Sequence, residues 1–448
     1  MKRYFKYSLH IFLLALLISG CKMEFENHNA ASEESVLQTP EAYPGMILGM
    51  TKHFTQNAYK EIVRGPGVIA REIGATNTYL TENELESGDI PNENSSISLL
   101  WRYLHYERGI AEKITDHIDD VTFPNSDEKE GIKAYAYFFR GMTTAYLAFY
   151  WEKATTVNDS DNKAEFVSRT DALNAALGYL DQALNIFNSN ANAVNYINSI
   201  VSLEFSVVDV INVFKARIYM ELGDYAQAIQ SANNVDLTTR SVWTYDGSTS
   251  NRNPIWVIQY DPGSNERWKP LENLGVNADP ADGRLNFYID TATPTNLTSN
   301  TCGFITRYLT GFWDSNSESV PVYLPDEIKL IKAEAYAHMG GANLVNAVVL
   351  IDEVRMDNSD IFGVNANLGP WTGNAADQQA VLDEVYYNIS MELYLQGLRW
   401  LAHRRIYPNH LNNVTPPVNC SKERTRNYYP YPFTERANNP NTPPDPSI

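Results

Sequence analysis

The sequence predicts a mostly α-helical fold, in which packed helical hairpins form a scaffold that carries a large loop-rich insert. Three observations predict it. From about Ser98 onward, apolar residues recur at helical spacing. Two stretches, near residues 216–228 and 331–347, alternate small and large residues as closely packed helix pairs do. Between them, from about Asp236 to Tyr323, the chain is rich in turn-forming residues with interspersed aromatic ones.

The first 21 residues have the pattern of a bacterial lipoprotein signal. Lys2, Arg3 and Lys6 precede an apolar run from Leu9 to Ile18, and Ser19-Gly20-Cys21 follows. A run of this length suits a signal peptide and falls short of the ~20 residues that span a bilayer. We therefore expect residues 1–20 to be a lipoprotein signal peptide and Cys21 to be lipidated as the mature N-terminus. An ordinary secretory signal with a chance cysteine is the alternative.

Charge and composition exclude several classes of function. Residues 1–20 hold three cations and no acids, so their removal takes the formal net charge from −19 to −22. Such an acidic chain repels the phosphates of nucleic acids and lacks a basic face for anionic lipids. The hydrophobic share of 44% is enough for a folded core. Cys302 and Cys420 could pair in an oxidising compartment, although two cysteines alone do not establish a disulfide.

The N-terminal elements follow in order. Residues 21–40 are polar and acidic without periodicity, which is typical of a flexible tether. Helical periodicity begins near Glu41 and extends to about Gln56, and residues 74–96 have the composition of a long loop. Ser126 is a candidate N-cap for a helix that ends near Tyr150.

Helical hairpins follow. Thr170 is expected to cap the next helix, and a third helix runs from about Val207 to Leu222. Gly223-Asp224 then forms a short turn before a helix that starts at Tyr225, and the small and large residues around this turn match tetratricopeptide hairpins. Ile331 to Ala347 is a second, imperfect copy. Because other material separates the copies, we expect several packed hairpins, not a regular solenoid.

One domain is predicted for residues 41–448. Its helical scaffold comprises residues 41–235 and 323–407, with a last helix from about Ala376 to Arg404. The loop-rich insert covers residues 236–322 and includes a short strand at Ile255–Tyr260. The C-terminal segment 408–448 is irregular and packs on the body through its aromatic residues.

Motifs for catalysis or for metal and cofactor binding are not found. The sequence lacks a metalloprotease helix, a phosphate loop, a dinucleotide-binding glycine pattern and a nucleophile elbow. The segment Asn158–Asn162 is the nearest to a calcium loop, but Ala164 and Thr170 stand where an EF-hand needs Gly and Glu. His105, His117, His338 and His403 fall on predicted helices, where a structural or exposed role is expected. We therefore predict no catalytic residue, no metal and no cofactor.

Aromatic and amide side chains are the candidates for ligand binding. Flat rings stack on the apolar faces of sugars, while neighbouring polar groups bond the hydroxyls. Each single aromatic residue is more often part of the core, so only some of them are expected to form such an arc. The candidates are Asn77, Tyr79, Asn94, Trp101, Trp243, Trp268 and Trp313.

Several segments, in order along the chain, resemble the SusD/RagB family of outer-membrane nutrient-binding lipoproteins of Bacteroidetes. After the lipid-site cysteine, the acidic Lys22–Glu26 is similar to a surface-export signal. Further segments that resemble the family are Lys133–Gly141, Phe214–Tyr225, Pro325–Tyr336, Glu392–Arg405 and Tyr431–Pro440.

The resemblance implies a scaffold of tetratricopeptide-like hairpins with a loop-rich ligand face. It also implies a surface lipoprotein of the outer membrane that captures oligosaccharides, or peptides, and delivers them to a TonB-dependent barrel of the SusC type. Two alternatives stay open at this point. One is a surface lipoprotein that hydrolyses glycans, and the other is a scaffold lipoprotein without a ligand.

Overall fold

The computed structural model describes residues 33–260, 268–295, 297–409, 424 and 426–447. Cys21 and Cys420 lie outside these residues, as do the signal peptide and most of the tether. The described chain is mostly helical with a few short strands, which confirms the predicted fold class. In the described part, no helix combines the length and apolar character needed to cross a membrane.

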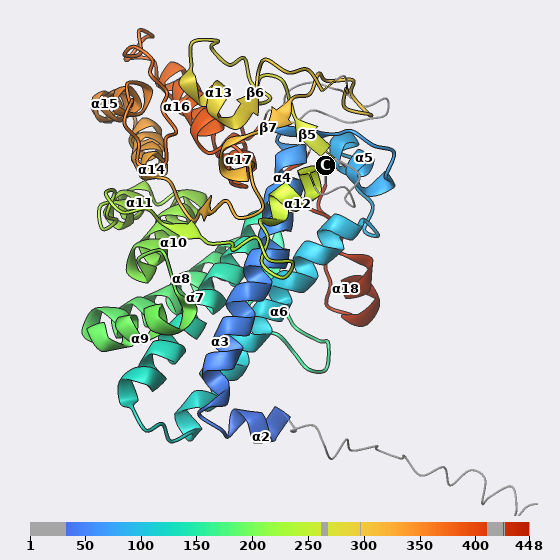
Figure 1. Ribbon diagram of the computed structural model, residues 1–448, viewed down its shortest axis with the longest axis vertical. Coiled ribbons are helices and arrows are strands. Elements are labelled where there is room, and N and C mark those ends of the chain that lie inside the picture. Colours follow the sequence, from blue (N-terminus) through green and yellow to red (C-terminus); the bar gives the residue numbers. More distant parts are fainter. Residues whose placement is uncertain (1–32, 261–267, 296, 410–423, 425, 448) are drawn as a thin grey trace, which may run out of the picture.

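Three consecutive N-terminal elements form one long helical rod, and two further helices lie beside it (Figure 1). The rod consists of α3 (Ala42–His53), the π-helical turn η1 (Phe54–Ala58) and α4 (Tyr59–Ile69). It therefore extends well beyond Gln56, where the sequence prediction ended. The short helix α2 (Glu33–Leu37) precedes the rod, and the long helix α6 (Ser95–His117) packs against it.

The segment 74–96 is not one long loop. It contains α5 (Leu80–Ser87), whose Glu82, Leu85 and Glu86 are buried. The polar composition of this segment led to the prediction of a loop. In the structure, however, the carboxylates of Glu82 and Glu86 are buried. Glu82 accepts a hydrogen bond from the buried Arg64 over 3.1 Å.

Helices α7 to α9 form the next layer. They are α7 (Ser126–Tyr150), α8 (Arg169–Ser189) and α9 (Ala191–Val201). The predicted extent of α7 is confirmed, but both predicted caps are wrong by one or two residues. Asn125 caps α7 by accepting from the Asp127 backbone N–H, and Ser168 caps α8 by accepting from the Asp171 backbone N–H.

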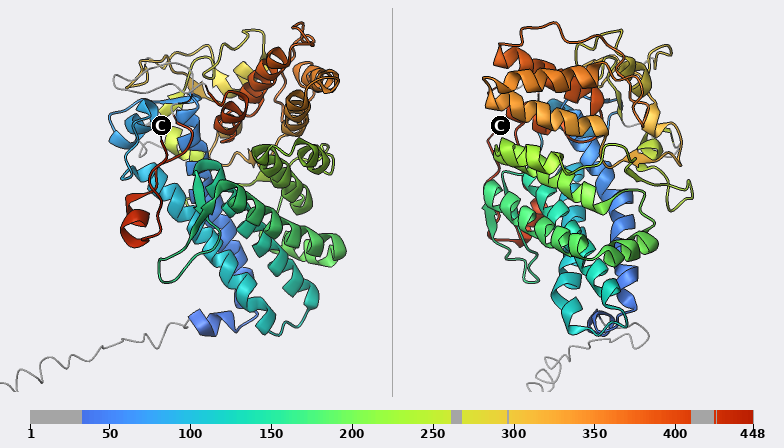
Figure 2. Two further views of the ribbon diagram at one scale, coloured as in Figure 1. Left: turned by 180° about the vertical axis from the view of Figure 1, so that it is seen from behind. Right: turned by 90° about the vertical axis from the view of Figure 1, so that its left-hand side faces the viewer.

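Two helical hairpins continue the stack, as the sequence predicts. The first pairs α10 (Val207–Leu222) with α11 (Tyr225–Ala232), and the second pairs α14 (Pro325–Met339) with α15 (Asn343–Arg355). The right-hand view of Figure 2 shows the helices of both hairpins layered above α8 and α9. The α11 and α14 helices are in contact, so the two hairpins join directly despite the insert between them.

The insert is held by short antiparallel strand pairs. Among the described residues, three pairs involve the insert: β1 (Ile73–Ala75) with β5 (Trp268–Pro270), β4 (Val242–Trp243) with β8 (Val320–Pro321), and β6 (Ile289–Asp290) with β7 (Tyr308–Leu309). A fourth pair, β2 (Lys153–Thr155) with β3 (Phe166–Ser168), lies outside the insert and flanks the loop 156–165. The insert also holds α12 (Pro254–Tyr260), α13 (Gly283–Tyr288) and the 3-10 turn η3 (Gly311–Trp313). The strand predicted at Ile255–Tyr260 is therefore wrong, because Asn253 Oδ1 accepts from the Ile255 and Trp256 backbone N–H groups and starts a helix.

The predicted last helix is broken into α16 (Gln378–Glu392) and α17 (Arg399–Ile406). Between α16 and α17, Leu395 and Gly397 have φ of 54° and 75°, so the chain does not continue as a right-handed helix there. A Cβ at Gly397 would lie 2.7 Å from the carbonyl oxygen of Ile62. The break therefore lets this turn pack closely on α4.

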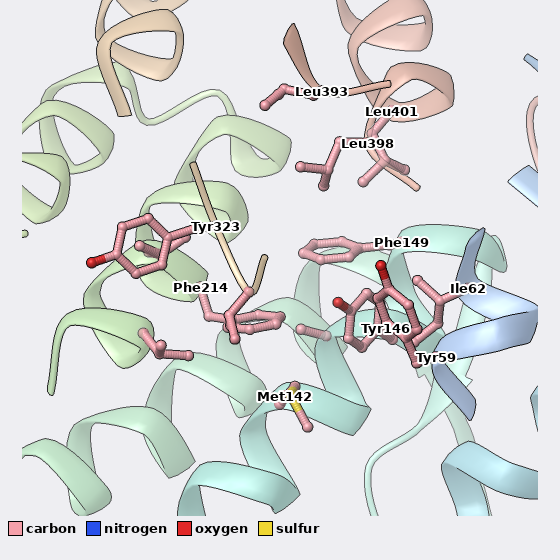
Figure 3. Close-up of a cluster of buried hydrophobic side chains, with 14 of the residues drawn as sticks. Tyr59, Ile62, Met142, Tyr146, Phe149, Phe214, Tyr323, Leu393, Leu398 and Leu401 are labelled. Atoms are coloured by element: carbon pink, nitrogen blue, oxygen red, sulfur yellow. The ribbon is translucent and has the colours of Figure 1, made fainter. Parts of the chain in front are cut away.

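A single core joins segments far apart in sequence. Figure 3 shows side chains from α4, α7, α10 and the α16–α17 region converging, among them Tyr59, Tyr146, Phe214 and Leu398. The C-terminal segment is packed on the body, as predicted, through the buried Tyr429 and Tyr431. It also contains the short helix α18 (Phe433–Asn438), which the sequence analysis did not predict.

Candidate functional site

A polar cleft of about 650 Å³ opens beside the N-terminal half of α6. Its walls come from α6, from the loop 156–165 between β2 and β3, and from α18, which lies next to α6 in Figure 1. Its lining includes Ser98, Leu99, Trp101, Arg102, His105, Asn158, Asp159, Asn162, Glu435, Asn438 and Asn439.

Trp101 lines the cleft and is only 4% exposed. Its ring stacks on Phe166 with centroids 5.9 Å apart and an interplanar angle of 12°, and Trp151 meets it edge-on at 4.9 Å. Its Nε1–H donates to Glu435 Oε2 over 3.1 Å. Trp101 therefore ties α6, β3 and α18 together and presents only its margin to the cleft.

The loop wall is held by Asn158. Its side-chain oxygen accepts from Arg108 over 2.7 Å, and its amide donates to the carbonyl oxygen of His105 over 2.8 Å. The Asn158 backbone N–H donates to the carboxylate of Glu112 over 3.1 Å. Burial and the neighbouring Arg108 hold the pKa of His105 well below its usual value. The imidazole is therefore neutral at physiological pH.

The α18 wall is held in the same manner. Asn439 Nδ2 donates to the carbonyl oxygen of Ala164 and to Glu435 Oε1, both over 2.9 Å. The Phe433 backbone N–H donates to the carbonyl oxygen of Asn92 over 2.8 Å. The cleft is therefore a prearranged set of amides, carboxylates and a guanidinium, which can donate to and accept from hydroxyl groups.

The three tryptophans proposed from the insert are not an exposed arc. Trp268 and Trp313 are 0% exposed and Trp243 is 5% exposed. Trp268 pairs with Ala75 in the β1–β5 sheet, and Trp313 packs between aromatic rings of the core. Trp268 and Trp313 are therefore part of the core in this structure, and a role of the three tryptophans in ligand binding stays a prediction that their burial does not favour. Trp243 forms part of the wall of a smaller hollow of about 280 Å³.

Asn94 is buried and has a structural task. Its side-chain oxygen caps α6 by accepting from the Ser96 and Ile97 backbone N–H groups. Its amide donates to Glu84 Oε2 over 2.9 Å, which fixes α5 beside α6. Asn94 therefore supports α5 and α6 and has no exposed surface for a ligand in this structure.

Asn77 and Tyr79 lie at the start of α5, away from the residues that line the cleft. Asn77 Oδ1 accepts from the Tyr79 backbone N–H over 3.0 Å, and Tyr79 is 43% exposed. Asn83 of α5 accepts from Asn300 and Thr301, so the insert covers this side of α5. Their role in ligand binding stays a prediction.

Sequence reasoning missed most of the cleft. Asn158 and Asp159 belong to the segment that the sequence analysis compared with a calcium loop and found not to fit. Asn439 belongs to the C-terminal segment that was expected to be irregular. The available signal was their density of amide and carboxylate groups. Among the described residues, no cluster of three His, Cys, Asp or Glu side chains could hold a metal ion. Cys302 is disulfide-bonded, and its partner lies outside the described residues.

Solved structures share this fold along nearly the whole chain. A SusD superfamily protein from Bacteroides thetaiotaomicron is 15% identical with a TM-score of 0.71, and the match covers 91% of this chain and 100% of that chain. A SusD superfamily protein from Bacteroides vulgatus is 13% identical with a TM-score of 0.70, covering 91% and 99%. A SusD-like carbohydrate binding protein from Bacteroides fragilis is 13% identical with a TM-score of 0.64, also covering 91% and 99%.

No family model matches the chain, and no curated protein matches it in sequence. The structural likeness nevertheless confirms the SusD-like fold that the resemblance implied.

Proposed function

We propose that this protein is a surface lipoprotein of the SusD/RagB family that captures oligosaccharides and delivers them to a TonB-dependent outer-membrane barrel. The observation that carries the proposal is the likeness to SusD superfamily structures over 91% of the chain. Lipid attachment at Cys21 fits a protein that works at the outer membrane, since the described helices provide no membrane span.

The cleft suits a hydroxyl-rich ligand. Arg102 and the amide groups of Asn438 and Asn439 can donate hydrogen bonds, while the carboxylates of Asp159 and Glu435 can accept them. Sugars offer both donors and acceptors on each ring, so a wall of mixed groups can satisfy them together. Because the supporting contacts are already formed, binding does not have to order the walls.

The contact with the barrel is assigned to the helical hairpins. On α15, Val345 and Val349 are 65% and 53% exposed, and Met356 just beyond the helix is 46% exposed. Val345 and Val349 are one helical turn apart, so they lie on the same side of α15. In Figure 1, α15 lies at the outer edge of the scaffold. A Val349→Asp change is expected to reduce co-purification with the barrel without changing glycan affinity.

A binding screen tests the capture function. The chain from residue 22 onward retains every described residue and is run on native gels that contain amylopectin, xylan, galactomannan, inulin or dextran. Calorimetry with oligosaccharides of the retarding polymer then gives Kd, and an oligopeptide panel is tested in parallel. The paired change Asp159→Ala and Asn438→Ala removes a polar group from each wall, and Asn346→Ala on α15 is the matched control.

Retardation by a polysaccharide that the wall variant abolishes and the control keeps would support glycan capture. Binding of peptides alone would show that the ligand is a peptide and not a glycan. Shortened products after incubation would favour a hydrolase instead, with the cleft carboxylates as the first groups to substitute. Absence of any binding would leave a scaffold lipoprotein as the better description.

A further inference from the structure

The cleft itself offers little aromatic surface, because the Trp101 ring is covered on its faces by Phe166 and Trp151. An aromatic surface does occur one helical turn further along α6. Tyr106 is 52% exposed, and Tyr103 is half-buried beside it. Both rings contact His53 of α3, with centroids 4.4 Å from Tyr106 and 5.3 Å from Tyr103.

This aromatic surface is continuous with the cleft. Leu99 and Arg102 line the cleft and stand three or four residues before Tyr103 and Tyr106, so all four share one side of α6. The guanidinium of Arg102 lies 5.2 Å from the centre of the Tyr103 ring. From Ser95 at the cleft to Tyr106 the helix rises by about 16 Å, which is longer than a single sugar ring.

His53 is held in place by a buried carboxylate, whose burial is unfavourable for stability. Its Nδ1 is hydrogen-bonded to Glu107 Oε1, and Glu107 is 0% exposed. The other carboxylate oxygen of Glu107 is buried with no hydrogen-bond partner in the described residues. Burying a carboxylate with one unpaired oxygen is unfavourable, so an apolar residue would serve stability better at this position. Its bond to His53 fixes a ring that is 28% exposed at the surface.

The backbone adds a second unusual feature at the same point. The π-helical turn η1 begins directly after His53 and separates α3 from α4. Such turns are rare and occur frequently at functional sites. The chain therefore combines His53 directly before a π-helical turn, a buried carboxylate that fixes its ring, and an exposed tyrosine against that ring.

We propose that His53, Tyr103 and Tyr106 form a second sugar-binding subsite, which extends the cleft along α6 so that the protein binds a glycan chain of several rings. This inference rests on the proposed function. The Tyr106 ring stacks on the apolar face of a sugar ring, and His53 and Arg102 supply polar contacts to its hydroxyls. Short ligands fill the cleft alone, whereas longer ones also reach Tyr106.

The test measures how substitution of Tyr106 changes the affinity for ligands of two lengths. The chain from residue 22 onward is titrated by calorimetry with a disaccharide and with a longer oligosaccharide of whichever of the five polysaccharides retards it. Tyr106→Ala removes the ring, and Tyr106→Phe keeps it. Tyr225→Ala is the matched control, because Tyr225 stacks on His338 at 4.8 Å in another part of the scaffold.

We expect Tyr106→Ala to weaken the longer ligand about five- to tenfold, with the disaccharide unchanged, taking aromatic stacking as the guide to magnitude. Tyr106→Phe and Tyr225→Ala should bind both ligands as the unmodified chain does. If Tyr106→Ala binds the longer ligand normally while the paired cleft variant loses it, the subsite is refuted and the proposed function stands. Equal losses for both lengths would also refute a separate subsite. If no polysaccharide binds, both proposals fail.

Discussion

Glu107→Gln should stabilise this protein at neutral and alkaline pH, although it removes a native hydrogen-bonded carboxylate. Burial raises the pKa of Glu107 to about 7, against a usual value of 4.5, because the bond to His53 offsets only part of the desolvation cost. A raised pKa in the folded state means that the folded protein holds the proton more tightly than the unfolded chain. The stability from this group is therefore present below about pH 4.5 and is lost as the pH rises through about 7.

The magnitude follows from the two pKa values. The step from 4.5 to about 7 corresponds to about 3 kcal/mol once the carboxyl is fully ionised in the folded protein. Glutamine has the shape of the neutral acid and carries no charge to bury. We therefore expect Glu107→Gln to raise the free energy of unfolding by up to about 3 kcal/mol near pH 8, with little difference near pH 4.5.

The same substitution at Glu334 is the matched control with the opposite sign. The ion pair with Arg405, at 2.7 Å, overcomes burial and lowers the pKa of Glu334 to about 2. That stability is present above about pH 4.5 and is lost as the pH falls through about 2. Glu334→Gln should therefore cost about 3 kcal/mol at neutral pH, and breaking a buried pair can add to this loss.

Urea unfolding of both variants and the unmodified chain, followed from about pH 4.5 to about pH 8, measures these differences while the contributions of all other groups cancel. A Glu107→Gln effect that is independent of pH, or a loss of stability near pH 8, would refute the account of Glu107. Such a result would mean that the carboxylate is better solvated or paired than its surroundings indicate.

Three further predictions concern the backbone turn, the cleft and the disulfide. In thermal unfolding, Gly397→Ala should destabilise the fold by more than about 2 kcal/mol, because Gly397 has a φ of 75° and the backbone of Ile62 lies close to it. The control Gly178→Ala, on the exposed side of α8, should be neutral or stabilising by up to about 1 kcal/mol. Asn439→Ala should cost about 1–3 kcal/mol and speed proteolysis of the C-terminal segment, because it frees the carbonyl of Ala164; an unchanged cleavage rate would contradict this. Reduction should lower the thermal midpoint, and peptide mapping without reductant should find Cys302 in a cross-linked peptide; a free thiol there would contradict it.

Local patterns in the sequence were sufficient for much of the scaffold. The helix at Val207–Leu222 and its turn at Gly223 are set by apolar spacing and by one glycine, and the structure has them at the predicted residues. Caps were less certain, since several neighbouring polar residues can each accept from a helix N-terminus. Asn125 and Ser168 serve in place of the predicted Ser126 and Thr170.

The sequence by itself therefore determined the fold class, the hairpins and the acidic character of the chain, because these depend on composition and on residues close together in sequence. The tertiary structure decided which aromatic rings are covered. Trp268 is buried because its strand pairs with residues 73–75, and Trp101 meets Glu435, which is 334 positions away. Exposure is a property of such distant pairings, so the cleft and the surface around Tyr106 became visible only when α3, α6 and α18 were placed together.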